Sequence, residues 1–227
     1  MREVILDTET TGLDPSSGDR VVEIGCIETH NHMPTGAHFH CYVNPERDMP
    51  EGAFAVHGLS SEFLSDKPIF ADVAAPFLEF IGTDPLVIHN AKFDMGFLNA
   101  ELSRLDKPAI EYSRAVDTVA LARRRYPGAQ VSLDALCRRF EIDLSRREKH
   151  GALLDAELLA EVYLYLMGGR QPGLDLNVDA AKAAAEGITE IERPQRPARP
   201  HAPSPAEAEA HEAFLDQITD PIWRSGT

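Results

Sequence analysis

Short apolar runs alternate with longer segments of helical periodicity along the first 170 residues. Five runs bounded by turn residues predict buried strands, at residues 4–6, 21–27, 39–43, 86–88 and 115–116. Because the first three runs follow one another closely, they indicate an antiparallel meander at the start of the chain. The later runs are separated by helical segments, as in an α/β fold.

Apolar residues three and four positions apart predict the helices. The clearest case is residues 70–81, and further helices are expected after Asn90, over 119–125, over 133–140 and from about 152 to 168. Asn90, Asp117 and Ser132 each directly precede a helical segment and carry side chains that cap helix N-termini.

The net charge of −15 argues against a protein that coats nucleic acid. Basic residues nevertheless concentrate in residues 123–149, a region that either holds a phosphate backbone or forms a solvated helix surface. Three scattered cysteines without a C-x-x-C pair indicate a reducing compartment rather than a disulfide or zinc framework. We see neither a signal peptide nor an apolar run of membrane-spanning length, and therefore expect a cytoplasmic protein without a membrane partner.

The first strand leads into the stretch D-T-E-T-T-G at residues 7–12. Residues two apart on a strand point to the same face, so the carboxylates of Asp7 and Glu9 project together. Neighbouring carboxylates repel each other, and a divalent cation with oxygen ligands is the simplest compensation. Two solvated acids at a strand end would look the same in sequence.

Three further candidates lie at helix starts. Asp94 falls in the first turn of its helix, where it would equally favour the helix dipole. Asp155 shares a mostly apolar stripe, where a carboxylate needs a partner. Side chains five positions apart on a helix point about 140° away from each other. His150 can therefore face the same site as Asp155 only if it lies on a loop before the helix. With the two acids of the first strand, these residues suit a site for two Mg²⁺ or Mn²⁺ ions.

Three motifs in order carry a family resemblance: D-x-E-T-T-G at 7–12, H-N-A-K-F-D at 89–94 and H-x4-D at 150–155. They resemble the motifs of the DEDDh 3′–5′ exonucleases, over residues 1 to about 168, and are most similar to those of the proofreading subunits of bacterial replicative DNA polymerases. The resemblance implies an RNase H-like mixed five-stranded sheet flanked by helices, with an exonuclease domain at residues 1–169.

The resemblance also implies residue roles. Asp7, Glu9, Asp94 and Asp155 would bind the two divalent cations, and His150 would act as general base. The reaction would release 5′-mononucleotides from DNA with a free 3′ end.

Four residues are candidates for binding the terminal nucleotide: Thr8, Thr10, His57 and Asn90. By resemblance, His57 and Asn90 lie beside the site, and the two threonines offer backbone contacts. We expect His57 in a loop, where a plain hydrogen-bonding role is the alternative.

The composition changes after Gly169. Residues 177–205, rich in Pro and Ala, predict a flexible linker, and residues 206–227 recover a short amphipathic pattern that includes the only tryptophan, Trp223. By resemblance, residues 206–227 dock on the catalytic (alpha) subunit of the polymerase, and residues 170–176 hold a sliding-clamp-binding peptide at 171–176. A helix folded back on the core is the alternative for the amphipathic segment.

Three other functions remain open at this stage. One is an exonuclease that trims RNA, because the five site residues do not distinguish DNA from RNA; the docking tail favours replication. Another is a phosphatase with Asp7 as nucleophile, although the sequence offers no convincing later pair of a lysine and an acid. The third is a non-catalytic adaptor between polymerase and clamp.

Overall fold

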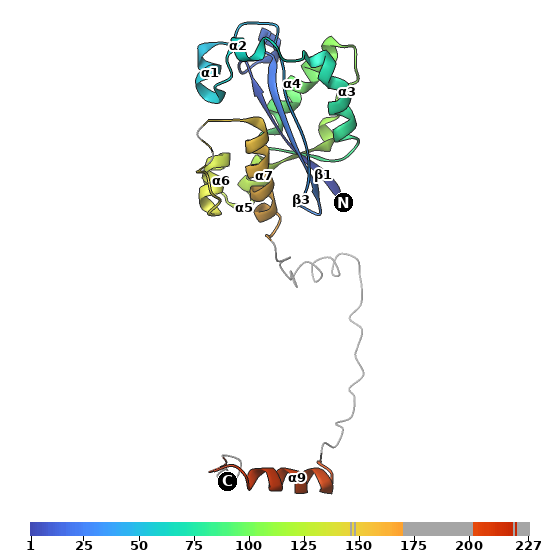
Figure 1. The fold of residues 1–227 in the computed structure, drawn as a ribbon, viewed down its shortest axis with the longest axis vertical. Helices are drawn as coiled ribbons and strands as arrows, with labels where there is room; N and C mark the ends of the chain where they lie inside the picture. The colour runs from blue at the N-terminus through green and yellow to red at the C-terminus, as the bar shows by residue number, and fades with distance from the viewer. Residues whose placement is uncertain (146, 148, 170–201, 220, 222–227) are drawn as a thin grey trace. The chain divides into compact units, whose positions relative to one another are not determined.

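A mixed five-stranded sheet forms the centre of the N-terminal part of the chain in the computed structural model (Figure 1). The strands are β1 (Arg2–Thr10), β2 (Val21–His30), β3 (Met33–Tyr42), β4 (Leu86–Ile88) and β5 (Ala115–Asp117). Their order is β3-β2-β1-β4-β5; the β1–β2 and β2–β3 pairs are antiparallel, and the β1–β4 and β4–β5 pairs are parallel. The predicted meander and the predicted mixed sheet are both confirmed.

The structure describes residues 1–145, 147, 149–169, 202–219 and 221. The chain divides into two units, Met1–Leu174 and Asp175–Thr227. The predicted clamp-binding peptide at 170–176 and most of the predicted linker at 177–205 lie outside the described residues. The second unit contains one described helix, α9 (Pro205–Leu215), within the segment predicted to be amphipathic.

In the described part of the first unit, seven α-helices accompany the sheet. They are α1 (Glu51–His57), α2 (Ser61–Leu64), α3 (Phe70–Ile81), α4 (Ala91–Arg104), α5 (Thr118–Arg125), α6 (Leu133–Arg139) and α7 (Ala152–Leu166), with short 3-10 helices at Pro15–Ser17 and Tyr112–Arg114. In Figure 1, α3 and α4 lie to one side of the sheet and α5, α6 and α7 to the other. No helix in the described part of the chain is long and apolar enough to cross a membrane.

The predicted helix starts are correct in position, and two of the three predicted caps form. Asp117 accepts hydrogen bonds from the backbone of α5, and Ser132 accepts one from the backbone of α6. Asn90 occupies the N-cap position of α4 with a φ of 68° and makes no side-chain capping bond, so that part of the prediction is wrong. The prediction that His57 lies in a loop is also wrong. His57 is the buried last residue of α1, and Gly58, with a φ of 75°, caps the helix directly after it.

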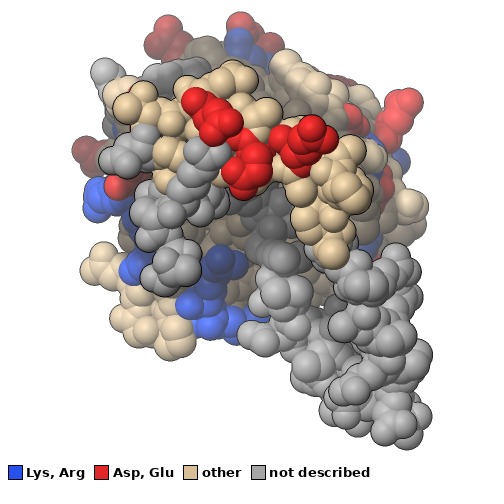
Figure 2. Space-filling model, turned by 90° about the horizontal axis from the view of Figure 1, so that it is seen from below, with Lys and Arg blue, Asp and Glu red and all other residues tan. Residues whose placement is uncertain are grey.

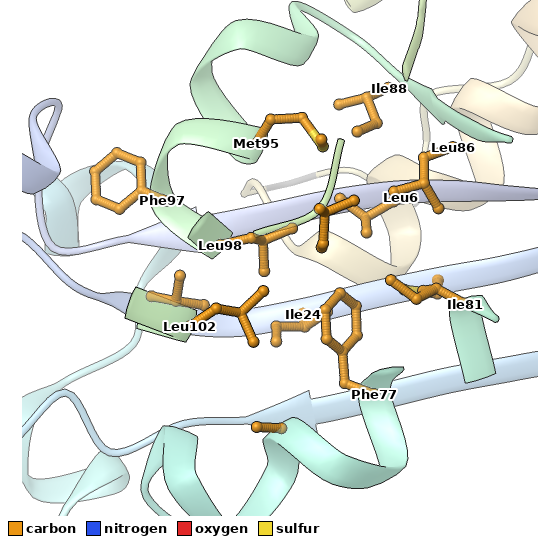
Figure 3. Packing of buried hydrophobic residues seen from close by; sticks show 14 of the residues in the cluster. Leu6, Ile24, Phe77, Ile81, Leu86, Ile88, Met95, Phe97, Leu98 and Leu102 are labelled. Atoms are coloured by element: carbon orange, nitrogen blue, oxygen red, sulfur yellow. The ribbon is translucent and has the colours of Figure 1, made fainter. Parts of the chain in front are cut away.

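Two apolar clusters cover the two faces of the sheet. Val4 and Leu6 pack with α3 and α4 in one cluster, whereas Ile5 packs with α5, α6 and α7 in the other. Figure 3 shows the first cluster, with Leu6 beside Leu86 and with Phe77 facing the sheet. Because side chains alternate along a strand, Asp7 and Glu9 continue the α7 face, and Thr8 continues the α4 face.

Gly25 fixes how closely α7 approaches the sheet. It pairs with Asp7 across the β1–β2 ladder, and a Cβ atom added at Gly25 would lie 2.3 Å from the backbone carbonyl carbon of Ala152. Only a residue without a side chain allows this contact. The first turn of α7, which contains Asp155, is therefore held against β2 and β1.

Candidate active site

The candidate residues converge where β1 and β4 end. These two strands are parallel, so their carboxyl ends lie at the same edge of the sheet. The first turn of α4 follows β4, and the first turn of α7 is packed over β1 and β2. Residues that are distant in the sequence are thus brought to one place.

Asp7 and Glu9 lie on the last part of β1, opposite Gly25 and Glu23 of β2. Glu9 is buried and Asp7 is partly buried. Among the described residues, no hydrogen bond or ion pair reaches either carboxylate. Both oxygens of each side chain therefore remain available to a ligand.

Asp94 is held from the other face of the sheet. The backbone N–H of Thr8 donates to Oδ1 of Asp94 at 3.1 Å, and the Thr8 hydroxyl donates to the same atom at 2.7 Å. Asp94 is almost fully buried. Burial raises the pKa of Asp94 to about 7, and the two hydrogen bonds from Thr8 limit the rise. The Asp94 carboxylate is thereby tied to the strand that carries Asp7 and Glu9.

His150 and Asp155 meet at the start of α7. His150 lies on the loop before the helix, as predicted, and its Nδ1 lies 3.3 Å from Oδ2 of Asp155. Glu9, His150 and Asp155 each offer one ligand atom, and the three atoms lie within 4.8 Å of one another. Three of the five predicted residues thus form a group that fits one cation.

The acids strongly influence one another. Burial, followed by the charges of Asp94 and Glu9, raises the pKa of Asp7 well above its ordinary value. Burial, followed by the charges of Asp155 and Glu23, raises the pKa of Glu9 to about 8. Such shifts mean that the ionised carboxylates lack sufficient positive charge around them.

Asp155 is the exception. Burial acts to raise the pKa of Asp155, but the hydrogen bonds and charges of Arg147 and His150 outweigh it and hold that pKa below its ordinary value. The one acid with a strong cationic partner is therefore the one that ionises readily.

A cavity of about 530 Å³ adjoins the acids. Its wall includes Thr8, Thr10, His57 and Phe93, with the loop at residues 11–13 and parts of α1. His57 accepts a hydrogen bond at Nδ1 from the backbone of Leu59, so the neutral ring carries its proton on Nε2. Among the described residues, that buried Nε2 has no hydrogen-bond partner that meets the usual geometry, although the backbone of Thr10 lies near enough to act on the pKa of His57. The ring itself forms part of the cavity wall.

Asn90 is exposed and is not part of this wall. It lies between β4 and α4, four residues before Asp94. The structure thus brings three of the four candidate nucleotide-binding residues to the cavity and leaves Asn90 beside it.

Sequence reasoning did not single out three side chains of this region. Phe93 lines the cavity. Glu23 is buried opposite Glu9, and its only sequence signal is an acid inside the apolar run 21–27. Arg147 contacts Asp155 and His150. Arg147 was part of the basic region at 123–149, but nothing in its spacing separates it from the exposed arginines around it.

The rest of the basic region is partly committed to contacts within the protein. Arg139 lies over the ring of Tyr126, and Arg125 donates to the backbone carbonyl of Leu166. On the face shown in Figure 2, lysine and arginine side chains form small separate groups rather than one continuous field. The exposure of Arg123, Arg124 and Arg138, together with these contacts, favours the solvated-surface interpretation for the described part of residues 123–149.

The donor set fits divalent cations that prefer oxygen ligands. Ligand atoms of Glu9 and Asp155 lie within 4.8 Å of each other, and the carboxylates of Asp7 and Glu9 have no partner among the described residues. Burial and then the charges of neighbouring acids raise the pKa values of Asp7 and Glu9. Bound cations would remove the repulsion among these charges.

This electrostatic arrangement predicts how stability depends on pH without metal. A group whose pKa is higher in the folded than in the unfolded state adds to the free energy of unfolding at low pH. That contribution is complete below the pKa of the unfolded state and is lost as the pH rises to the pKa of the folded state. Because the pKa of Glu9 rises from 4.5 to about 8 and that of Asp94 from 3.8 to about 7, the Tm of the chain in EDTA should fall between about pH 4 and pH 8.

Thermal unfolding of Glu9→Gln should show a smaller fall over the same range, and saturating Mg²⁺ should reduce the fall in the unmodified chain. Glu79→Gln, at an exposed position of α3, is the matched control and should behave like the unmodified chain. A Tm independent of pH in EDTA, or an equal fall in Glu9→Gln, would contradict the electrostatic account.

Comparison with solved structures places the fold. Exonuclease X, solved in complex with 5′ overhanging duplex DNA, is 27% identical with a TM-score of 0.58, covering 73% of this chain and 90% of that one. The nuclease domain of 3′hExo, a DEDDh family member bound to rAMP, is 16% identical with a TM-score of 0.64, covering 73% of this chain and 91% of that one. The second likeness concerns the fold alone.

Sequence comparison places the family. The RNase T exonuclease model matches residues 4–163. The DNA polymerase III subunit epsilon of Rickettsia felis is 50% identical over 224 residues, 96% of this chain and 97% of that protein. The same subunit of Escherichia coli K12 is 43% identical over 238 residues, 99% of this chain and 98% of that protein. The chain therefore belongs to the exonuclease family and, within it, to the epsilon subunits of DNA polymerase III, the proofreading 3′–5′ exonucleases.

Proposed function

We propose that the chain removes nucleotides from a free 3′ end of DNA by a reaction that uses two divalent cations, Mg²⁺ or Mn²⁺, and that it does so as part of DNA polymerase III. The observation that carries this proposal is the group of buried, mutually repelling carboxylates beside a cavity of about 530 Å³. Such a site has room for a terminal nucleotide next to cation ligands.

Asp7, Glu9 and Asp155 would hold one cation, and Asp7 together with Asp94 would hold the second. When bound, the cations supply stabilisation for negative charge on the attacked phosphate and on the leaving oxygen. The hydrogen bonds from Thr8 leave Oδ2 of Asp94 free for this purpose and fix the direction in which it points.

His150 would accept the proton of the attacking water. An imidazole titrates near working pH, and a position on the loop before α7 lets the half-exposed ring approach a phosphate. Asp155, fixed in the first turn of α7, would stabilise the imidazolium that forms.

The terminal nucleoside would occupy the cavity lined by Thr8, Thr10, His57 and Phe93. The phenyl ring offers an apolar surface for a base or sugar, and the Nε2–H of His57 would donate to an oxygen of the nucleotide. Asn90, exposed at the start of α4, would contact the nucleotide from outside the cavity.

Two observations favour DNA over RNA as substrate. The epsilon subunits that cover nearly the whole chain are named as parts of a DNA polymerase. Exonuclease X, at 27% identity, was solved with DNA bound. The site residues alone suit either nucleic acid, so a direct comparison of the two substrates decides the matter.

The second unit would attach the chain to the catalytic subunit of the polymerase. Helix α9 begins with a capping box formed by Ser204 and Glu207, and it exposes 59% of Phe214 to solvent. An exposed aromatic residue on a short helix suits a hydrophobic groove on a partner. The sliding clamp would bind residues 171–176.

Substitutions of Asp7 and His150 test the proposed nuclease activity. With 3′-labelled single-stranded DNA and Mg²⁺, Asp7→Ala should lower the rate of 5′-mononucleotide release at least about a thousandfold, equivalent to about 4 kcal/mol. His150→Ala should lower it by about 10²–10⁴. The matched control Glu79→Gln should release nucleotides at the unmodified rate. Undiminished release by Asp7→Ala would remove the assignment, and faster release from RNA than from DNA would favour the RNA-trimming alternative.

Substitution of α9 tests the docking role. Phe214→Ser should leave digestion of an oligonucleotide unchanged and weaken binding to the polymerase catalytic subunit at least about tenfold, measured by titration of the two purified proteins. Tyr112→Ser, which replaces an aromatic residue that is 54% exposed in the nuclease unit, should bind normally. Equal binding by both variants would argue for a helix without a docking function.

A further inference from the structure

One guanidinium group occupies the cation-binding side of the site. Arg147 lies on the loop between α6 and α7, and its side chain is only 8% exposed. Its Nε donates to Oδ1 of Asp155 at 2.5 Å, and its Nη2 donates to Oδ2 at 2.7 Å. Both oxygens of a proposed cation ligand are therefore bound by one arginine.

The same guanidinium also holds the proposed general base. Nη2 of Arg147 lies 2.8 Å from Nδ1 of His150. The same ring nitrogen lies 3.3 Å from Oδ2 of Asp155, so Arg147 and His150 meet at one carboxylate.

These contacts involve the atoms that would bind a cation. Asp155 and His150 are two of the three residues whose ligand atoms lie within 4.8 Å of one another. A guanidinium and a divalent cation carry the same sign of charge and would repel each other when they share one carboxylate. Occupation of the site by a cation therefore opposes occupation by Arg147.

Arg147 has a second anchor to which it can shift. Its Nη1 donates to Oδ1 of Asp134 on α6 at 2.5 Å, and the side chain of Asp134 is 40% exposed. Asp134 is not part of the group of cation ligands. The guanidinium can thus release Asp155 and His150 while keeping an acidic partner.

From these contacts we propose that Arg147 competes with a divalent cation for the carboxylate of Asp155, and that the guanidinium would shift toward Asp134 when a cation is bound. The contact between Arg147 and His150 would be lost with that shift. This inference rests on the cation site of the proposed function. It assigns Arg147 as a positioning residue that would couple cation binding to the placement of His150.

The alternative is an arginine that only supports the orientation of Asp155. The two interpretations predict opposite signs for metal affinity. A competitor weakens cation binding, so its removal tightens binding; a support improves the ligand geometry, so its removal weakens binding.

The test is the affinity of the full chain for Mn²⁺ without nucleic acid, measured from the electron paramagnetic resonance signal of free Mn²⁺. Arg147→Gln should bind Mn²⁺ about three- to tenfold more tightly than the unmodified chain. Arg147→Lys, which keeps the charge but loses the planar fork, should lie between the two. Arg124→Gln, an exposed arginine on α5, is the matched control and should bind like the unmodified chain. Unchanged or weaker binding by Arg147→Gln would overturn the inference.

A second measurement follows the Nε–H nuclear magnetic resonance signal of Arg147 in the unmodified chain. In the metal-free chain labelled with ¹⁵N, the Nε–H signal of Arg147 should show the shift and slow exchange of a carboxylate-bound guanidinium, and saturating Mg²⁺ should abolish both. A signal that Mg²⁺ leaves unchanged would overturn the displacement. Arg147→Lys serves only to assign the signal.

The Asp7→Ala variant distinguishes failure of the proposed cation site from failure of the proposed role of Arg147. If it binds Mn²⁺ as tightly as the unmodified chain, or if the unmodified chain binds none, the cation site itself is wrong and this inference fails with it. If Asp7→Ala loses Mn²⁺ binding while Arg147→Gln gains no affinity, only the role of Arg147 is wrong.

Discussion

Repulsion among carboxylates at one edge of the sheet is the constraint around which the site is built. Burial and then the neighbouring acids raise the pKa values of Asp7 and Glu9, and burial raises that of Asp94. Of the four site acids, Asp155 alone has its pKa held below the ordinary value, by Arg147 and His150. Elsewhere the protein neutralises its buried acids with its own side chains. For example, Glu101 accepts two hydrogen bonds, at 2.6 and 2.9 Å, from the guanidinium of Arg20, which directly precedes β2. The unbalanced acids are therefore a feature of the site and not of the fold in general, and bound divalent cations would balance them.

The fold supplies this arrangement through strand alternation and two helix starts. Asp7 and Glu9 face α7, which Gly25 allows to lie directly against the sheet, whereas Thr8 faces α4 and binds Asp94. Strand β1 therefore connects proposed cation ligands that lie on both of its faces. The same edge carries the cavity for a nucleotide, so the geometry that brings the acids together also places them beside the proposed substrate.

Much of this was predictable because the signals are local. The apolar runs gave the strands of the meander, and motif order gave the acids and His150. What sequence reasoning missed depends on contacts made only in three dimensions. His57 was expected in a loop because helix α1 is too short for a periodic pattern, and Arg147 looked like any other arginine of a basic region. The lack of a side-chain cap at Asn90 likewise depends on its φ of 68°, which composition does not reveal.

The central claim is that divalent cations bind among the carboxylates of Asp7, Glu9, Asp94 and Asp155. The most direct measurement is anomalous diffraction from crystals of the full chain soaked in Mn²⁺, because it locates the metal independently of activity. The account predicts Mn²⁺ peaks at coordination distance from these carboxylates, with Asp7 contacting two of them. Crystals that bind Mn²⁺ only elsewhere, or that show these carboxylates turned away from a common centre, would contradict it.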